Sequence, residues 1–417
     1  MIIEKIKINS DLFLDHVRFV TGREGDGANI IVTIPPKYNC LFSNERGEVH
    51  ISLSEFGNVV NSILSRKTEY GNENLDKWER FDHDKDFLVQ KELDQSPIVD
   101  ELILHVFSQI NGAPKSFWPE GKKAAICFTH DVDSIDGLSF FWLRRMNWYW
   151  HWLKAKKAGN HREADRWMSK SKQWIRFKKM NIDPMDSFDH IRELEARYGF
   201  RSTFFFMSLR HGLSREGRRY AVQNPRVVQV ARELLKDGWE VGLHASYHNH
   251  LSLPLLKEQK QRLEDTIQAR VIGCRHHYFR VRFPQSWKLY ARAGFDYSSN
   301  MGWGGGFNGF RAGTCFPFQP LKSEYSLWEI PVQLADWNPI IDSEYYVNTF
   351  SSYLTSIKAV GGFLVMNFHQ ENLSEDVAPG VENAYRKILE TIANDQEVMV
   401  LTMQEICTLM NCVPKMA

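Results

Sequence analysis

The sequence predicts an α/β protein with a parallel sheet that is either closed into a barrel or covered by helices on both faces. The chain has 417 residues, of which 43% are hydrophobic, so it can fill a large core. After residue 114, short apolar runs alternate with helix-like stretches about seven times, as in repeated β-α units. The expected strands are Ala124 to Phe128, Ser202 to Met207, Glu240 to Leu243, Val271 to Phe279, Trp328 to Val332, Phe363 to Phe368 and Val398 to Thr402.

The first 113 residues are expected to form a small accessory α/β domain, and residues 114–417 are expected to form the barrel. Residues 30–34 and 49–53 have a β-like composition, and a helix is expected from Pro97 to Ile110. The turn-forming residues Asn111-Gly112-Ala113-Pro114 end this helix and mark the boundary. Residues 1–110 gather no carboxylates, histidines or glycines at a chemical spacing, so no part of the active site is expected there.

Residues 138–180 interrupt the β-α alternation and are expected to form a helical insertion after the first barrel strand. They contain twelve Lys or Arg residues and two acids, a net charge of +10; because the whole chain carries +1, the remainder carries −9. Six of the thirteen tryptophans lie in this segment. It can contact an acidic or lipid-linked saccharide or a membrane surface, or it can be a helical hairpin packed on the barrel.

The overall composition argues against nucleic acid as a partner and against a bilayer-spanning role. A net charge of +1 gives no general attraction to nucleic acid, and no run approaches the ~18 apolar residues needed to cross a bilayer. The N-terminus lacks the apolar stretch of a secretion signal, and the six cysteines form no C-x-x-C pair. The expected location is therefore the cytoplasm, with peripheral contact at the inner membrane face through residues 138–180.

Two aspartates follow the first expected barrel strand in the sequence Thr129-His130-Asp131-Val132-Asp133. In a strand, residues i and i+2 point to the same side, so Asp131 and Asp133 should emerge together at the carboxyl end, where barrel active sites lie. Two ionised carboxylates this close repel each other, and a divalent cation is the usual reason that such a pair is tolerated. A polar loop with a helix cap is the alternative interpretation.

Two histidines follow a second expected strand, in Gly242-Leu243-His244-Ala245-Ser246-Tyr247-His248. If the chain turns helically after the strand, His244 and His248 lie on one face and can bind a single ion. Two imidazoles and one carboxylate leave coordination positions open, as a catalytic metal site requires. The H-x-x-x-H spacing is weak evidence alone, but it is stronger beside D-x-D at an equivalent strand end.

Three further strand ends carry polar residues that fit an active site. Arg275, Arg280 and Arg282 lie within one short segment, and one of them could pair with a site carboxylate and keep it ionised. Asp336-Trp337 follows another strand, and His369 follows the strand at 363–368. A histidine there is a candidate general acid because its pKa lies near neutrality, and a satisfied core histidine is the alternative.

The order of these motifs resembles the polysaccharide deacetylase superfamily, also called the NodB-homology or carbohydrate esterase family 4 proteins. More narrowly, Thr129 to Asp133, Gly242 to His244, Arg275 to Arg280 and Gly309 to Cys315 resemble its "THDVD" branch. The resemblance covers roughly residues 115 to 415, and five motifs in the same order are more specific than any one of them.

The resemblance implies a distorted (β/α)7 barrel of the NodB type that hydrolyses an N-acetyl or O-acetyl group on a saccharide, with a metal-activated water as nucleophile. Its ion would be one divalent metal, zinc first, with cobalt, nickel or manganese also acceptable to mixed N/O ligands. The implied roles are the following: Asp131 as base, Asp133, His244 and His248 as metal ligands, Arg280 as the partner of Asp131, Asp336 as a supporting residue, and His369 as acid.

Trp337, Tyr278 and Met366 are expected to contact the substrate, with Met366 as a wall for the acetyl methyl group. Two positions depart from the common family pattern: Val132 separates the aspartates, and Ala245 replaces a Ser or Thr after the first histidine. Two other functions remain open at this point, hydrolysis of a non-carbohydrate amide at the same metal site and a catalytically silent glycan-binding module.

Overall fold

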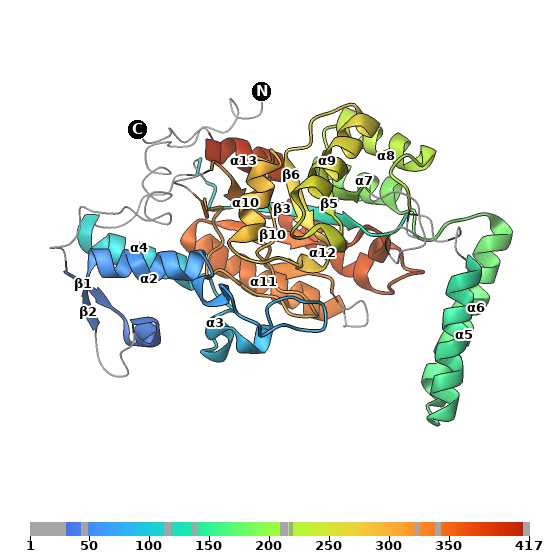
Figure 1. The fold of residues 1–417 in the computed structure, drawn as a ribbon, viewed down its shortest axis with the longest axis horizontal. Coiled ribbons are helices and arrows are strands. Elements are labelled where there is room, and N and C mark those ends of the chain that lie inside the picture. Colours follow the sequence, from blue (N-terminus) through green and yellow to red (C-terminus); the bar gives the residue numbers. More distant parts are fainter. Residues whose placement is uncertain are drawn as a thin grey trace.

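A curled parallel sheet forms the centre of the molecule, with helices around its outside (Figure 1). The computed structural model describes residues 31–42, 49–111, 118–119, 121–135, 138, 141–208, 216, 220–321, 325–337 and 343–411. The strands of the sheet are β3 (Ala124–Val132), β4 (Thr203–Met207), β5 (Glu240–Ala245), β6 (Gly273–His276), β7 (Tyr297–Ser298), β8 (Trp328–Glu329), β9 (Leu334–Ala335), β10 (Phe363–Asn367) and β11 (Val398–Val400).

The strands follow the order β8-β7-β6-β5-β4-β3-β10-β9, all neighbours are parallel, and β11 pairs with β3 beside this path. The two edge strands, β8 and β9, are joined by residues 330–333 alone. Four residues span at most about 14 Å, so the two edges of the sheet must approach each other. The predicted α/β class with a curled parallel sheet is thereby confirmed.

The sheet is buried on both faces because helices cover its outside and side chains fill its inside. All nine residues of β3 are buried. The outer helices are α7 (Phe188–Ala196), α8 (Pro225–Lys236), α9 (Leu253–Ile267), α10 (Gln285–Arg292), α11 (Ser343–Val360), α12 (Val381–Ala393) and α13 (Met403–Asn411). In α8 the buried residues are Val227, Val230, Ala231 and Leu234, a spacing that places one apolar stripe against the sheet. Asn224 caps this helix by accepting a hydrogen bond from the backbone N–H of Arg226.

The N-terminal part contains a small antiparallel pair, β1 (Ile31–Ile34) and β2 (Val49–Ser52), and the helices α2 (Leu53–Leu64), α3 (Phe87–Gln90) and α4 (Ile98–Asn111). Residues of α4 such as Val99 and Val106 belong to the same hydrophobic core as β3. The predicted domain boundary near residue 113 lies outside the described residues, so it stays a prediction.

Buried polar contacts also join the N-terminal part to the barrel. Glu69 accepts hydrogen bonds from Arg311 Nη2 at 2.8 and 3.0 Å and from Arg66 Nε at 2.8 Å, and Arg66 also pairs with Asp86. All four side chains are buried. Because two guanidinium groups share the carboxylate of Glu69, removing its charge would leave them undercompensated in a low-dielectric environment.

The predicted helical insertion is a hairpin of α5 (Phe141–Lys157) and α6 (His161–Met180) that projects from the barrel (Figure 1). Trp148 and Trp174 lie between the helices with ring centroids 5.2 Å apart, in a small apolar cluster separate from the main core. Within the described ranges, the model contains no helix with the length and apolar character needed to span a bilayer.

We expect the substitution Glu69→Gln to lower the free energy of unfolding by about 3 kcal/mol, because it leaves buried arginines without their full counter-charge. Urea unfolding followed by circular dichroism would measure this. Glu73→Gln is the matched control, since Glu73 is exposed and its change should fall within about 0.5 kcal/mol of wild type. Equal stability of both variants would contradict a structural role for this ion cluster.

Candidate metal centre

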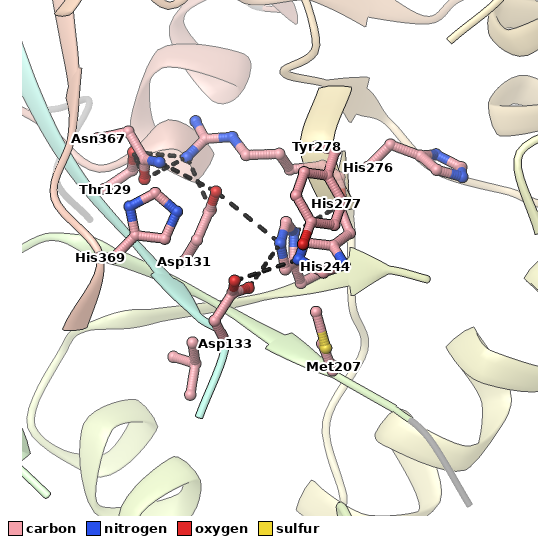
Figure 2. Close-up of polar contacts among 12 residues, drawn as sticks. Thr129, Asp131, Asp133, Met207, His244, His276, His277, Tyr278, Asn367 and His369 are labelled. Carbon is pink, nitrogen blue, oxygen red and sulfur yellow. Dashed lines mark hydrogen bonds and ion pairs between the residues drawn. The ribbon is translucent and has the colours of Figure 1, made fainter. Parts of the chain in front are cut away.

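Polar side chains from four strands meet at the carboxyl end of the curled sheet (Figure 2). Asp131 lies in β3 and Asp133 directly after it, His244 lies in β5, and His277 directly follows β6. Asn367 ends β10, and His369 follows it by two residues. Parallel strands place their carboxyl ends on one side of the sheet, which is why residues so distant in sequence lie together.

The D-x-D sequence behaves as strand alternation requires. Asp131 and Asp133 point into the site (Figure 2). His130 points away from it, as its contacts show. His130 contacts the backbone oxygen of Phe368 at 2.8 Å and Glu195 Oε1 at 2.9 Å, and it is fully buried. His130 is therefore a structural residue, and the two aspartates are the ones presented to the cavity.

Asp133, His244 and His277 form a buried group that could hold a metal ion. Their potential ligand atoms all lie within 4.8 Å of one another. His244 Nε2 is 3.3 Å from Asp133 Oδ1, and His277 Nε2 is 3.1 Å from Asp133 Oδ2. A tetrahedral site with bonds of about 2.0–2.2 Å has neighbouring ligand atoms about 3.3 Å apart, so both the spacing and the N/O donor set fit a divalent ion.

The second nitrogen of each histidine is fixed by the surrounding protein. His244 Nδ1 lies 3.1 Å from the backbone oxygen of Arg275, which can only accept, so Nδ1 donates a proton there and Nε2 is the ring atom that faces Asp133. His277 Nδ1 lies 2.5 Å from Glu216 Oε1. Burial raises the pKa of Glu216, but the hydrogen bond and charge of His277 outweigh this and lower it below its usual value. A carboxylate behind a ligand histidine is typical of metal sites.

His248, the expected third ligand, is not part of this group. Strand β5 continues through Ala245, and Ser246 is also extended, with φ −67° and ψ 152°, before a 3-10 turn at Tyr247–Asn249. The helical turn that would place His248 on the same face as His244 is therefore absent, and the His248 side chain is exposed. His277 is the third member of the candidate ligand group instead. Its signal was present in the sequence, because Arg275 and His277 follow the same i, i+2 alternation as the two aspartates.

Arg275, rather than the predicted Arg280, is the partner of Asp131. Its Nη1 lies 3.1 Å from Asp131 Oδ1, and the guanidinium is completely buried. Asn367 Nδ2 donates to Asp131 Oδ2 at 3.0 Å. Burial raises the pKa of Asp131, but the nearby charges of His244 and Arg275 outweigh it and lower the pKa. Asp131 is thus held as a carboxylate 3.9 Å from His244 Nε2, beside the candidate metal ligands.

Arg280 contacts other residues because it lies beyond the end of β6, after a 3-10 turn. It pairs with Glu79 of the N-terminal part, and its Nη1 donates to the backbone oxygen of Tyr247 at 2.7 Å. Its guanidinium also lies 4.0 Å from the centre of the Tyr247 ring. Arg280 therefore fastens an N-terminal loop to the rim of the site. The sequence does not show that Arg275 is buried, and an arginine at a strand end is usually interpreted as a surface residue.

His369 and Asp336 form a second hydrogen-bonded pair in the site. His369 Nδ1 lies 2.6 Å from Asp336 Oδ1, and the backbone N–H of His369 donates to Asp336 Oδ2 at 2.9 Å. Burial alone would lower the pKa of His369, but the charge of Asp336 and its hydrogen bond outweigh this and raise it to about 10. Asp336 thus keeps the imidazole protonated and directs its Nε2 side toward the cavity that both aspartates line.

The site opens into a cavity of about 450 Å³, and residues from the N-terminal part also line this cavity. The expected substrate residues Trp337 and Tyr278 line it, together with Trp78 and Arg80. The Trp78 and Tyr278 rings are stacked with centroids 4.6 Å apart. Single aromatic and basic residues carry no recognisable spacing, so site residues among the first 110 could not be predicted from the sequence.

The position of Arg80 depends on a glycine segment of the barrel. Its Nε donates to Asp76 Oδ2 at 2.7 Å, and a Cβ added at Gly304 would collide with its guanidinium. The glycine therefore leaves the space through which Arg80 reaches the cavity.

Met366 does not line the cavity as predicted. It is fully buried in β10 beside Asn367, and Asn367 points into the site. Because neighbouring residues of a strand face opposite sides, Met366 points toward the outer helices.

Comparison with family models finds no matching family, and comparison with curated proteins also finds no match. Among solved structures, the chain is similar to a Mycobacterium smegmatis protein provisionally described as a polysaccharide deacetylase, with 19% identity and a TM-score of 0.48 over 71% of this chain and 92% of that chain. It is also similar to Puue allantoinase, with 14% identity and a TM-score of 0.47 over 73% and 97% of the two chains.

A mutant CE4 family pseudoenzyme with restored activity matches at 11% identity and a TM-score of 0.35, over 69% of this chain and 68% of that chain. At these identities and scores the similarities carry no information about activity. The assignment to the "THDVD" branch stays a prediction.

We expect His277→Ala to weaken retention of a divalent ion at least about 100-fold, because it removes one of three buried ligands. His248→Ala is the matched control and should retain the ion, since its side chain is exposed and outside the ligand group. Elemental analysis after dialysis would measure the metal content of both variants. Loss of the ion from His248→Ala with retention in His277→Ala would reverse the ligand assignment.

Proposed function

We propose that this protein is a metal-dependent hydrolase that removes an N-acetyl or O-acetyl group from a saccharide. The observation that carries the proposal is the arrangement around the Asp133, His244 and His277 group. A carboxylate, Asp131, lies beside these ligands, and a protonated imidazole, His369, lines the same cavity. Acyl hydrolysis requires a base for the attacking water and an acid for the leaving group, and these two residues supply both.

Asp131 is suited to act as the base. A divalent ion at the ligand group would polarise the acyl carbonyl and lower the pKa of a water molecule from about 15.7 toward ~7. Asp131 accepts the proton of the attacking water, and it is ready to do so because Arg275 and Asn367 keep it ionised and fix its orientation. The lowered pKa of Asp131 means that this carboxylate is available throughout the neutral range.

His369 is suited to act as the acid. Its Nδ1–H donates to Asp336, so the second proton, on Nε2, can pass to the nitrogen of a leaving amine or the oxygen of a leaving alcohol. A raised pKa keeps that proton in place at neutral pH. Asn372 Nδ2 donates to Asp336 Oδ2 at 3.0 Å and thereby holds the carboxylate that orients the imidazole. Asp336 is a positioning residue in this scheme.

The cavity walls support a saccharide as the substrate. Trp78 and Trp337 provide aromatic surface on which sugar rings can stack through their C–H groups, and Tyr278 supports the Trp78 ring from behind. The polar rim, including Arg80 and Asn372, offers hydrogen-bond donors for hydroxyl groups. The +10 charge of residues 138–180 favours an acidic or lipid-linked form of this saccharide. Zinc is the first choice of ion, and cobalt, nickel and manganese also suit this donor set.

We expect wild-type protein to release acetate from a panel of N- and O-acetylated oligosaccharides, and Asp131→Asn to lose about 10²–10⁴-fold in kcat while keeping its metal. His248→Ala should retain wild-type rates. Enzymatic acetate determination and elemental analysis on the same samples would measure both properties. A metal-stripped protein or an Asp131→Asn variant with full activity would refute the proposal. Hydrolysis of a non-carbohydrate amide alone would support the other substrate class, and glycan binding without acetate release would indicate a silent module.

The substitution Asp336→Asn should move the alkaline limit of activity to lower pH. In the wild type, activity should fall only as the pH rises through the pKa of His369, which is about 10. Removing the charge of Asp336 removes the largest influence that raises the pKa of His369, while burial still lowers it, so the protonated form is lost at lower pH. A pH profile of kcat would measure the shift. An unchanged alkaline limb would show that His369 is not the acid.

A further inference from the structure

Helix α5 carries large apolar side chains that are exposed to solvent. The exposed fractions of Trp142, Met146, Tyr149 and Trp150 are 66%, 67%, 56% and 51%. At 100° per residue, Met146 and Trp150 lie about 160° around the helix from the buried Trp148. Trp142, Met146 and Tyr149 also line a groove with Trp167 and Met168 of α6. The apolar surface of α5 therefore extends from the contact with α6 to the exposed side of the helix.

An exposed apolar face of this size is unusual on a protein surface that contacts only water. Leu143 and Leu153 extend it, with exposed fractions of 46% and 36%. From Trp142 to Leu153 it covers about 17 Å of helix, along the side of the hairpin rather than at its tip. Single exposed apolar residues are ordinary, but a contiguous apolar face of this length indicates an interaction surface.

Positive charge surrounds this apolar face. The guanidinium of Arg145 lies 5.5 Å from the Trp142 ring centre, and Lys154 Nζ lies 4.3 Å from the Trp150 ring centre. Lys156 and Lys157 at the end of α5 are exposed, as is Lys172 in α6. In the part of the chain that the structure describes, none of these three lysines forms an ion pair. Lys156, Lys157 and Lys172 are thus open to an external anionic partner.

We propose that α5 binds the surface of a membrane that contains anionic phospholipids, with the helix lying along the interface. Trp and Tyr favour the headgroup boundary, Met and Leu favour the acyl region beneath it, and Lys and Arg favour anionic headgroups. The hairpin combines all three features on one projecting element (Figure 1).

A second copy of the chain is a poorer occupant, because two hairpins of charge +10 repel each other when their α5 faces meet. Nucleic acid would neutralise the basic residues but would leave the stripe of Met and Leu in water. Membrane binding does not depend on the metal centre. It would place the proposed hydrolase beside a lipid-linked saccharide, and that consequence alone rests on the proposed function.

Vesicle co-sedimentation tests the proposal. Wild-type protein should sediment with vesicles of phosphatidylcholine mixed with phosphatidylglycerol, and much less with phosphatidylcholine alone. The double variant Trp142→Ser/Met146→Ser should bind the anionic vesicles at least about tenfold more weakly, because it removes two exposed apolar side chains. The matched control Leu251→Ser/Leu255→Ser, which changes residues 52% and 45% exposed on the barrel, should bind as the wild type does.

A charge variant, Lys156→Glu/Lys157→Glu, should also weaken binding to anionic vesicles, and high salt should weaken binding of the wild type. Circular dichroism and metal content of the hairpin variants should match those of the wild type, so a failure of membrane binding is distinguishable from a failure of the metal site. Equal binding by wild type and Trp142→Ser/Met146→Ser would overturn the proposal. So would a dimer, detected by light scattering, that this variant converts to a monomer without any vesicle binding.

Discussion

The carboxylate pair of Asp131 and Asp133 imposes the main electrostatic constraint on the site. The two residues lie on one face of a buried chain segment, where like charges repel strongly because water is excluded. The protein compensates them from different sides. Arg275 and Asn367 hold Asp131, whereas His244 and His277 face Asp133. This division gives the two carboxylates different surroundings, which is what the proposed function requires of a base and a metal ligand.

The second group of charges is organised in the same way. Asp336 is buried and bonded to both the backbone and the ring of His369, so the imidazole is fixed and charged before any substrate arrives. Preorganised charges of this kind cost no reorganisation during reaction, which is the general basis of electrostatic catalysis. The curled sheet makes the arrangement feasible because it brings the ends of β3, β5, β6 and β10 to one place.

The N-terminal part and the hairpin extend this centre in two separate ways. Glu79 pairs with Arg280 at the rim, and Trp78 and Arg80 reach the cavity, so the N-terminal part completes a wall of the site. The hairpin instead places a basic and apolar surface on a projecting element (Figure 1). Charge is correspondingly separated, with +10 on residues 138–180 and −9 on the remainder of the chain. The proposed chemistry and the proposed membrane binding therefore depend on separate parts of the structure.

The sequence by itself determined the features that depend on local periodicity. The alternation of apolar runs and helical patterns predicted the parallel sheet, the i, i+2 spacing predicted that Asp131 and Asp133 share a face, and the break in rhythm at 138–180 predicted the helical insertion. Strand-end position also identified His369. In each case the relevant geometry is set within a few residues by the backbone, so the sequence pattern carries it.

Only the tertiary structure decided which of several similar residues enter the site. His277 lies in the site and His248 does not, because β5 stays extended past His244. Arg275 reaches Asp131 and Arg280 does not, because only Arg275 lies within the buried strand β6. Met366 was excluded by the side of β10 on which it lies, and Glu216, Trp78 and Arg80 were added from segments distant in sequence. Which residues enter the site depends on where strands end and on which segments pack against them. The spacing of the residues in the sequence determines neither.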